Sequence, residues 1–346
     1  MQINSRKIGL GQPTYIIAEI SANHNRGFST AQELIKAAKE AGADAVKVQT
    51  YTADTLTIKS EKRYFKIQRG TLWDGRTLYD LYQEASMPWE WQPRLKRYAD
   101  RLGIDFFSSA FDPTSVDFLE KMNVPAFKIA SFELVDIPLI EKIAKTKKPM
   151  IISTGMASLG EIKEAVLAAR RAGTKQIALL KCTSAYPAPL DEMNLRVIPF
   201  LIREFNVPVG LSDHTMGSVA ALGAVALGAS IIEKHFTLSR KSKGPDSVFS
   251  AEPAELRQMV MDIRALEQSL GKSSILIGKK EKKNRIFRRS LFVIKNIARG
   301  EKFSADNVRS IRPAHGLKPK FLKKVIGRTA RRSLKRGSPL SHSAIL

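Results

Sequence analysis

Two histidines end two neighbouring apolar runs of this sequence. Residues 207–236 read VPVGLSDHTMGSVAALGAVALGASIIEKHF, and one apolar run ends at His214 while the next ends at His235. The residues between them have a helical pattern, so the stretch predicts a strand, a helix and a second strand. In a parallel α/β sheet both strand ends lie at one edge, where two imidazoles can share a divalent metal ion. Alternatively, both histidines are simply hydrogen-bonded at strand ends, because this spacing is less diagnostic than two histidines one helical turn apart.

Polar side chains end all eight apolar runs of residues 1–270. They are Glu19, Lys47 with Gln49, Ser108 with Ser109, Lys128 with Ser131 and Glu133, Ser153 with Thr154, Lys181 with Thr183 and Ser184, Asp213 beside His214, and Glu233 beside His235. Lysines are seldom buried unless they are paired, so a purely structural interpretation is unsatisfactory. Lysines, hydroxyls and loop amides together are what a phosphate or carboxylate group requires, and we expect an anion site at these strand ends.

The runs that carry these side chains predict the fold. Eight β-rich runs occupy residues 15–20, 45–50, 105–109, 126–131, 150–154, 177–183, 207–212 and 230–235. Helical patterns such as TAQELIKAAKEAGA, VDFLEKMN, IPLIEKIAKT, LGEIKEAVLAARRAGT and VIPFLIREF lie between most of them. Eight βα units in about 270 residues are typical of an α/β fold of the (β/α)8 barrel type, whose active sites lie at the carboxyl ends of the strands. A doubly wound sheet is less favoured, because no G-x-G-x-x-G follows the first strand.

The charge of the chain is concentrated near its end. The whole chain has a net charge of +24, but residues 272–346 contain 22 Lys and Arg against three acids, and the preceding 271 residues have a net charge of only +5. This asymmetry predicts a barrel domain over 1–270, an exposed basic linker over 271–285 and a small β-rich module over 286–346. Within the module, Arg299 and Gly300 predict a turn, and SADN at 304–307 predicts a helix cap.

A long segment rich in aromatic residues follows the second predicted strand. It spans about residues 51–86 and contains Tyr51, Tyr64, Phe65, Trp73, Tyr79 and Tyr82. Loops of this length are usually functional or disordered, and the aromatic content argues against disorder. The segment is therefore either a lid or substrate wall, or a small helical excursion around LYDLYQEA.

Composition and termini exclude several classes of protein. No apolar run approaches the roughly 18 residues that span a bilayer, and the first 20 residues lack the apolar core of a signal peptide. The single cysteine, Cys182, excludes an intramolecular disulfide and fits a reducing compartment, so we expect a cytoplasmic protein. No membrane partner is therefore expected. The basic tail has few aromatic residues among its lysines and no zinc-knuckle or RRM signature, so a nucleic-acid partner is not expected either.

Nine short motifs occur in an order that is similar to one known family. They are AEISANHN, AVKVQT, FKIAS, ISTGM, KCTSAYP, GLSDHT, EKHFT, GPD and IRPAHG. In this order they resemble the sialic acid synthases, which join phosphoenolpyruvate to an N-acetylated amino sugar and end in an antifreeze-like (SAF) domain. LWDGRTLYDLYQEA, SSAFD, KIASFE and LLKCTSAYPAP look like the pseudaminic acid synthase branch, whereas the neuraminate branch more typically has STPF and HCT at the matching places.

The resemblance implies a role for specific residues. His214 and His235 match the ligands of a divalent ion such as Mn2+, Co2+ or Mg2+, with water and substrate at the remaining positions. The residues that match contacts to phosphoenolpyruvate are Lys47, Ser109, Lys128, Ser131, Ser153 and Ser184, and Lys47 and Lys128 are also expected to assist catalysis. Glu19 matches a general base. Gln49, Tyr186 and Asp246 match contacts to the acceptor sugar, and Arg312 matches an arginine delivered by the antifreeze-like domain of a partner subunit in a domain-swapped homodimer.

The resemblance also implies a reaction. For this branch the acceptor is 2,4-diacetamido-2,4,6-trideoxy-altropyranose, and phosphate leaves by C–O cleavage to give pseudaminic acid. The metal ion polarises the sugar aldehyde, C3 of phosphoenolpyruvate attacks it, and water activated near Glu19 adds at C2. N-acetylneuraminate or legionaminate synthesis is the alternative within the family.

Two other classes of function remain open on the residues alone. Lys128 or Lys181 at a strand end can form an imine with a ketoacid, as in a Schiff-base aldolase. The basic tail can bind nucleic acid by charge alone. Borohydride trapping and filter binding, respectively, distinguish these classes from a metal-dependent synthase.

Overall fold

The structure, a computed structural model, describes residues 1–68, 70–242, 244–272 and 274–346. The chain divides into two compact units, Met1–Gly271 and Lys272–Leu346, and each is described by itself. Ser273, which belongs to the predicted linker, lies outside the described residues.

Eight parallel strands of the first unit close into a barrel, in the order β10-β3-β4-β5-β6-β7-β8-β9. Their bounds are β3 Tyr15–Glu19, β4 Ala45–Thr50, β5 Asp105–Ala110, β6 Phe127–Ile129, β7 Met150–Ser153, β8 Ile177–Cys182, β9 Val209–Asp213 and β10 Ile231–His235. Every residue of β3, β7, β9 and β10 is buried, which explains why these strands are continuous runs rather than alternating patterns. The strand ends lie within two residues of those predicted from the sequence, and the predicted (β/α)8 barrel is confirmed.

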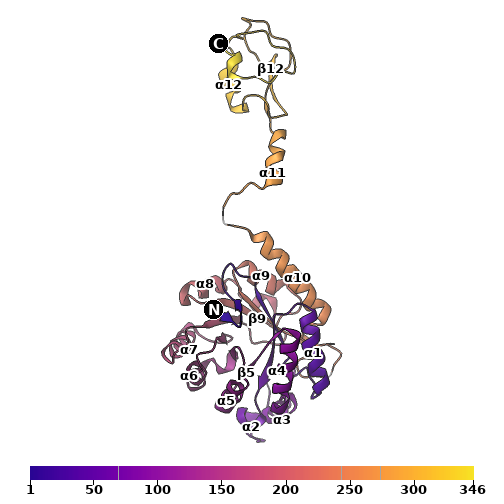
Figure 1. Cartoon of the computed structure of the whole chain (residues 1–346), viewed down its shortest axis with the longest axis vertical. Helices are drawn as coiled ribbons and strands as arrows, with labels where there is room; N and C mark the ends of the chain where they lie inside the picture. The colour runs from indigo at the N-terminus through magenta and orange to yellow at the C-terminus, as the bar shows by residue number, and fades with distance from the viewer. Residues whose placement is uncertain (69, 243, 273) are drawn as a thin grey trace. The chain divides into compact units, whose positions relative to one another are not determined.

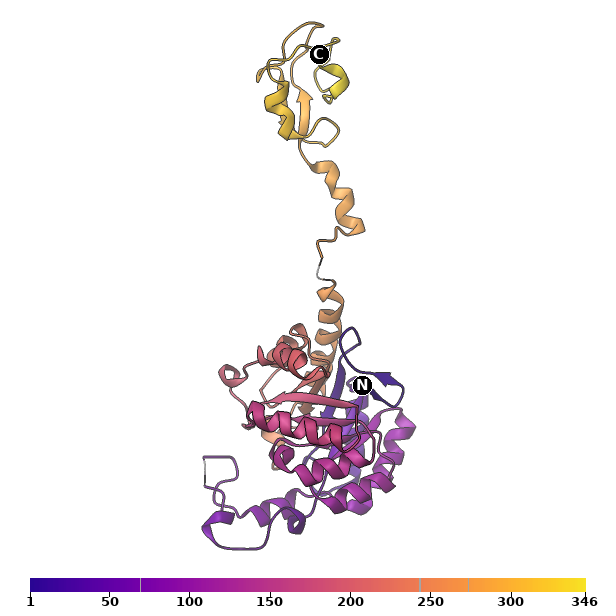
Figure 2. The same cartoon turned by 90° about the vertical axis from the view of Figure 1, so that its left-hand side faces the viewer.

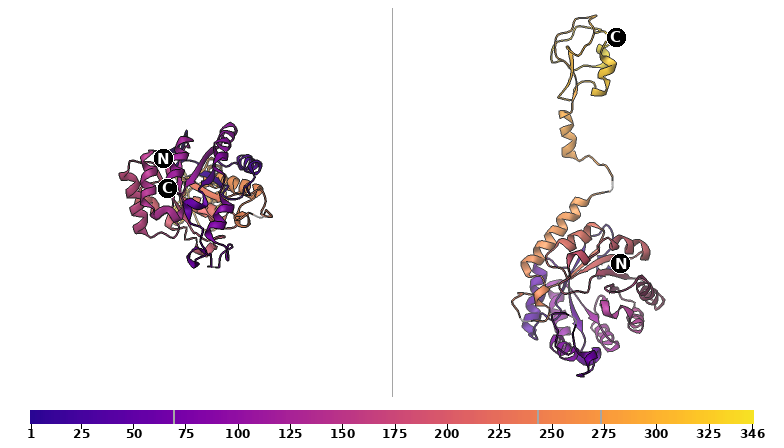
Figure 3. Two further views of the ribbon diagram at one scale, coloured as in Figure 1. Left: turned by 90° about the horizontal axis from the view of Figure 1, so that it is seen from below. Right: turned by 180° about the vertical axis from the view of Figure 1, so that it is seen from behind.

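Helices surround the strands (Figures 1 and 3). They are α1 Phe28–Glu40, α4 Gln92–Leu102, α5 Pro113–Lys121, α6 Ile137–Lys145, α7 Leu159–Arg171, α8 Val197–Phe205, α9 Val219–Ala226 and α10 Pro253–Leu270. Each packs an apolar stripe on the barrel; in α6 the stripe consists of Leu139, Ile140, Ile143 and Ala144. Among the described residues, no helix is both long and apolar enough to cross a membrane.

Helix caps fix the loops that leave the carboxyl ends of the strands. Asp112 accepts hydrogen bonds from the amides of Thr114 and Ser115 at the start of α5, at 2.8 and 3.2 Å. Ser158 begins α7 with a capping box, in which its own amide donates to the Glu161 carboxylate at 2.7 Å. Such caps stabilise a helix by about 1 kcal/mol each. They also hold the short loops after β5 and β7, the strands that carry the predicted site residues Ser109 and Ser153.

The aromatic segment after β4 folds as a helical excursion. It contains α2 Ala53–Leu56 and α3 Leu78–Ala85, which contact one another, and the short 3₁₀ helix η1 Arg63–Phe65. α3 is the predicted LYDLYQEA helix, and the excursion lies at one end of the barrel (Figure 2). The indole nitrogen of Trp73 donates to the carbonyl of Pro245, at 3.3 Å, in the segment after β10. The segment is thus a helical excursion that also forms part of a wall at this end of the barrel.

A short hairpin covers the opposite end of the barrel. It pairs β1 Gln2–Ile3 with β2 Arg6–Lys7. The side-chain amide of Asn4 in its turn donates to Asp105 at the beginning of β5, at 2.6 Å. This end contains the amino-terminal ends of the strands, so the hairpin supports the fold rather than the site.

The second unit is small and has its own core. It contains α11 Lys279–Lys283, α12 Leu322–Val325 and an antiparallel pair, β11 Ser290–Val293 with β12 Val308–Ile311. Its buried core consists of Leu291, Val293, Ile297, Phe303, Val308, Val325, Ala330, Leu334, Leu340 and Ala344. Isolated bridges such as Ile297 with Leu334 extend the pairing. The exposed helix α11 lies within the segment predicted as a linker.

The predicted helix cap at 304–307 is wrong. These residues form a turn, and β12 begins directly after it at Val308. The Asn307 side chain accepts a hydrogen bond from the amide of Ser304 at 2.8 Å, which closes the turn locally. Val308 is buried in the core of the unit, so tertiary packing continues the chain as a strand. Serine, aspartate and asparagine favour turns as strongly as caps, and the local sequence does not separate the two.

Candidate active site at the carboxyl end of the barrel

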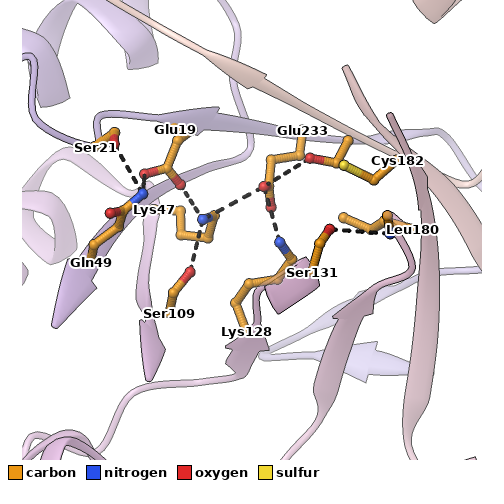
Figure 4. A network of polar contacts seen from close by, with 12 residues as sticks. Glu19, Ser21, Lys47, Gln49, Ser109, Lys128, Ser131, Leu180, Cys182 and Glu233 are labelled. Carbon is orange, nitrogen blue, oxygen red and sulfur yellow. Dashed lines mark hydrogen bonds and ion pairs between the residues drawn. The ribbon is translucent and has the colours of Figure 1, made fainter. Parts of the chain in front are cut away.

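Four buried charged residues meet inside the carboxyl end of the barrel, and we call Glu19, Lys47, Lys128 and Glu233 the charged cluster (Figure 4). Lys47 forms an ion pair with Glu19, and its Nζ lies 3.5 Å from Glu233 Oε1. Lys128 Nζ lies 3.1 Å from the same oxygen. The Lys47 ammonium also donates to Ser109 Oγ at 2.9 Å. Two cations and two carboxylates therefore balance in a site without access to bulk water.

The charged cluster shifts the pKa values of its members in opposite directions. Burial raises the pKa of Glu19, although Lys47 opposes the shift. Burial also disfavours the Lys47 ammonium, but Glu19 and Glu233 outweigh it and raise the Lys47 pKa. Burial lowers the pKa of Lys128 despite Glu233. Burial opposes ionisation of Glu233, but Lys128 and Lys47 outweigh it and lower the Glu233 pKa. Glu19 is therefore the carboxylate of the pair that takes up a proton more readily, as a general base must.

Hydroxyl groups converge on Gly155 in the loop after β7, and we call Ser131, Ser153, Ser184 and Gly155 the hydroxyl cradle. The Gly155 amide donates to Ser131 Oγ at 3.2 Å. A methyl group built on Gly155 would lie 2.2 Å from Ser184 Oγ and 2.7 Å from Ser131 Oγ. Ser153 Oγ is buried and has no hydrogen-bond partner among the residues that the structure describes. A buried hydroxyl without a partner, two residues before the glycine that two other hydroxyls approach, fits an anion with several acceptor oxygens.

The two predicted metal ligands lie close together, with their rings edge to face. The rings of His214 and His235 are 5.3 Å apart between centroids, and Tyr186 lies against His214 at 4.4 Å. His214 Nδ1 contacts the carbonyl of Thr183 at 3.0 Å. His235 Nδ1 is buried and makes no hydrogen bond within the described part of the chain. The structure therefore brings together the two imidazoles that the sequence predicted as neighbours.

These residues fit a divalent ion that takes only two ligands from the protein. Over residues 1–68, 70–242, 244–272 and 274–346, no group of three or more His, Cys, Asp or Glu side chains is arranged to hold a metal ion. Burial holds the pKa of His235 well below its usual range, so this ring is neutral, as a ligand must be, whereas at His214 burial is outweighed by the contact with Cys182, which raises the pKa. The unpartnered Nδ1 of His235 is the observation that favours an ion here. Water and substrate would supply the remaining ligands.

Two of the predicted sugar-contacting residues are joined through a residue that the sequence did not single out. Ser21 Oγ accepts a hydrogen bond from Gln49 Nε2 at 2.9 Å and donates one to Asp246 Oδ2 at 2.5 Å. Gln49 Nε2 also lies 3.3 Å from Glu19 Oε1, which connects this group to the charged cluster (Figure 4). Tyr186 stands apart, against His214 and 5.8 Å from the Trp73 ring.

Two predicted participants are not part of this arrangement. Lys181 donates to the carbonyl of Cys182 and to Thr183 Oγ1, both at 2.8 Å, so its ammonium is satisfied by its own strand end. Arg312 belongs to the second unit, where it follows β12 and is exposed. Its role as a residue delivered by a partner subunit stays a prediction.

Three residues of the site were not assigned a role from sequence. Glu233 bridges the two lysines, and its position two residues before His235 on the same strand was a usable signal, because alternate residues share a face. Gly155 follows the end of a strand, and a glycine at such a position is only a weak signal that a ligand approaches the backbone closely. Ser21 and Asp246 are 225 residues apart, and no local pattern connects them.

Both units of the chain match models of known protein families. The NeuB family model matches residues 34–274, and the SAF domain model matches residues 288–346. The chain is 46% identical to a pseudaminic acid synthase of Helicobacter pylori, over 95% of this chain and 97% of the relative. It is 39% identical to an N,N'-diacetyllegionaminic acid synthase of Campylobacter jejuni, over 93% of this chain and 97% of the relative.

A solved structure has the same architecture. The crystal structure of a spore coat polysaccharide biosynthesis protein from Bacillus subtilis matches with a TM-score of 0.68 and 35% identity. The match covers 100% of this chain and 99% of the other. The similarity thus extends over both units and is not confined to the barrel.

Proposed function

The chain belongs to the NeuB family, and we propose that it is a pseudaminic acid synthase that joins phosphoenolpyruvate to 2,4-diacetamido-2,4,6-trideoxy-altropyranose with release of phosphate. The observation that carries the proposal is the group of two buried lysines and the buried Glu19, with Ser131 of the hydroxyl cradle close to Lys128 (Figure 4). Phosphoenolpyruvate needs groups for a phosphate, for a carboxylate and for a water molecule, and these three features supply them. The 46% identity to a pseudaminic acid synthase favours this sugar over those of the related synthases.

Each part of the site has a role in the proposal. The hydroxyl cradle holds the phosphate, and Lys128 and Lys47 offset the negative charge of the substrate with Ser109 in support. As the C2–C3 double bond of phosphoenolpyruvate opens, C3 bonds to the aldehyde carbon of the sugar, whose oxygen takes up a proton, and water adds at C2 with loss of its proton to Glu19. The bond from C2 to the phosphate oxygen then breaks while the new C2 hydroxyl loses its proton and becomes the keto group. Gln49, Asp246 and Tyr186 orient the acceptor sugar. Phosphate leaves with the oxygen that bridged it to C2, and the water oxygen stays in the product.

We propose that His214 and His235 hold a divalent ion at this site, with Mn2+, Co2+ or Mg2+ as candidates. When bound, such an ion supplies Lewis-acid polarisation of a carbonyl oxygen. The unpartnered Nδ1 of His235 and the distance of 5.3 Å between the two ring centroids support this placement. The protein's own part is to keep both rings buried and oriented, through the Thr183 carbonyl on one side and Tyr186 on the other.

Phosphate release from phosphoenolpyruvate tests the function. With Mn2+ present, we expect release with the altrose-derived diacetamido sugar, and much less with its legionaminic counterpart or with N-acetylmannosamine. A matched reaction with EDTA should lose activity, and Mn2+ in excess should restore it. Preference for either other sugar would overturn the branch assignment. Activity that survives EDTA would overturn the metal assignment, and no release with any sugar would overturn the proposed function.

We also propose that two copies assemble around the barrel mouth. Large apolar side chains are exposed on the segments that directly follow β6, β7, β8, β9 and β10, and we call them the apolar rim: Phe132, Met156, Leu190, Val219 and Val248, each at least 56% exposed. Exposed apolar groups gathered around one opening indicate an interaction surface. In the proposed domain-swapped homodimer, the second unit of the partner covers this rim and brings Arg312 to the sugar.

Mixing two inactive variants tests this assembly. Glu19→Gln and Arg312→Ala are each expected to lose activity alone. If Arg312 serves the partner's barrel, a mixed dimer has one site with both defects and one site with none, so activity should return on mixing after subunit exchange. Up to about half the sites of each mixed dimer would be intact. A mixture that stays inactive, although exchange is demonstrated, would contradict the swapped arrangement.

A further inference from the structure

Ser21 has a backbone conformation that glycine would adopt more easily. It follows β3 with φ of 45°, in the left-handed region where a β-carbon is strained. Its side chain is buried at 5% exposure. Glycine at this position would remove the strain, so the presence of serine needs a compensating function for the side chain.

The hydroxyl of Ser21 joins three separate elements. It receives a hydrogen bond from Gln49 of β4 and gives one to Asp246 in the segment after β10, while Ser21 itself follows β3. The nearby Asn23 joins the same two segments, because its side chain accepts from Ser247 at 3.0 Å and donates to Ser250 at 2.9 Å. The loop after β3 is therefore held against the segment after β10, and the Ser21 side chain cannot turn away without breaking both of its bonds.

The direction of these hydrogen bonds is determined by their acceptor. Asp246 Oδ2 also accepts from the backbone amide of Ala22 at 3.4 Å, so this oxygen is an acceptor and the Ser21 hydroxyl donates its single proton to it. The hydroxyl oxygen can then only accept from Gln49, which must present its NH2 group. Glu19 Oε1, lying 3.3 Å from that NH2 group, imposes the same orientation. The Gln49 carbonyl oxygen is therefore left to face elsewhere, as an acceptor for an N–H or O–H group.

We propose that Ser21 is a positioning residue for the acceptor sugar: its hydroxyl decides which end of the Gln49 amide faces the sugar and holds the Asp246 carboxylate in place. The inference rests on the proposed function, in which Gln49 and Asp246 contact the sugar. A sugar with acetamido groups offers N–H donors, and an amide that is free to flip would present the wrong group to them. Ser21 thus contributes to the choice between sugars that differ in stereochemistry at the acetamido-bearing carbons.

Ser21→Gly and Ser21→Ala test the proposal together. Both remove the hydroxyl, but only glycine relieves the backbone strain, so an effect that is shared by both variants belongs to the hydroxyl. We expect the KM for the diacetamido sugar to rise about tenfold in both. The KM for phosphoenolpyruvate should change by less than about twofold, because no hydrogen bond in the described residues joins Ser21 to the hydroxyl cradle. The preference for the altrose-derived sugar over its legionaminic counterpart should also fall.

Asn206→Gly is the matched control. Asn206 has a similar positive φ of 50° but ends α8, away from the site. This variant tests whether replacing a non-glycine residue of positive φ by glycine, which removes backbone strain, by itself alters the kinetics. The KM values for both substrates should stay at the parent level. Circular dichroism and thermal unfolding establish that all three variants fold.

The outcomes separate this inference from the proposed function. If the parent is active and both Ser21 variants keep the parent's sugar KM and sugar preference, the inference is wrong and the proposed function stands. If the KM values for sugar and phosphoenolpyruvate rise together, Ser21 has a general structural role and the inference is also wrong. If the parent releases no phosphate with any of the three sugars, both fail.

Discussion

Replacing Gly155 by Ala is expected to raise the KM for phosphoenolpyruvate about 100-fold, or roughly 3 kcal/mol of binding free energy. The added methyl group would lie 2.2 Å from Ser184 Oγ and 2.7 Å from Ser131 Oγ, which are impossible contacts. Both hydroxyls are the ends of short side chains and can rotate away, so the protein should still fold. That rotation removes two donors from the hydroxyl cradle. Steady-state kinetics with each substrate varied in turn measures the effect.

Gly160→Ala provides the control for this substitution. Gly160 lies in the first turn of α7, and a methyl group there would approach only Ser158 Oγ, at 3.8 Å. Gly160→Ala adds the same methyl group five positions after Gly155 in the sequence, and it should slightly stabilise α7. Its KM for phosphoenolpyruvate should match the parent. An unchanged KM in Gly155→Ala would show that the hydroxyl cradle does not hold the phosphate.

Replacing Glu19 by Gln is expected to lower kcat by a factor of about 100 to 10,000, the usual contribution of a positioned general base. Glutamine keeps the size of the side chain and cannot accept the proton of the attacking water. Lys47 keeps Ser109 at 2.9 Å and shares Glu233, at 3.5 Å, with Lys128, so its ammonium retains one carboxylate neighbour. Burial already raises the pKa of Glu19, and the neutral replacement suits the same environment. The loss in free energy of unfolding should therefore be smaller than the rise in activation free energy that corresponds to the fall in kcat.

The control for this change is Glu192→Gln. Glu192 follows β8, at the same end of the barrel, but it is exposed and does not belong to the charged cluster. Glu192→Gln therefore makes the same chemical change outside the cluster. Phosphate release under saturating substrates measures kcat for both variants, and thermal unfolding checks the fold. Full turnover by Glu19→Gln in a folded protein would show that another group activates the water.

The sequence determined the barrel with little ambiguity. Parallel strands that are buried on both faces are rich in apolar residues over their whole length. In the helices packed on them, apolar residues recur every three or four positions, so each strand and helix can be recognised from its own stretch of sequence. The two histidines and the polar strand ends were visible for the same reason, because a barrel brings every strand end to one face. The turn at 304–307 shows the limit of such local signals: the same residues suit a helix cap, and only the burial of Val308 selects a strand.

Which strand-end residues work together was decided by the tertiary structure. The closed barrel places Glu233 between Lys47 and Lys128, while Lys181, equally polar in sequence, is satisfied by its own strand end. Strand register and barrel closure determine which side chains point inward, and both depend on pairings between distant segments. The contact between Ser21 and Asp246 joins residues 225 positions apart, and only the folded chain brings them to hydrogen-bond distance.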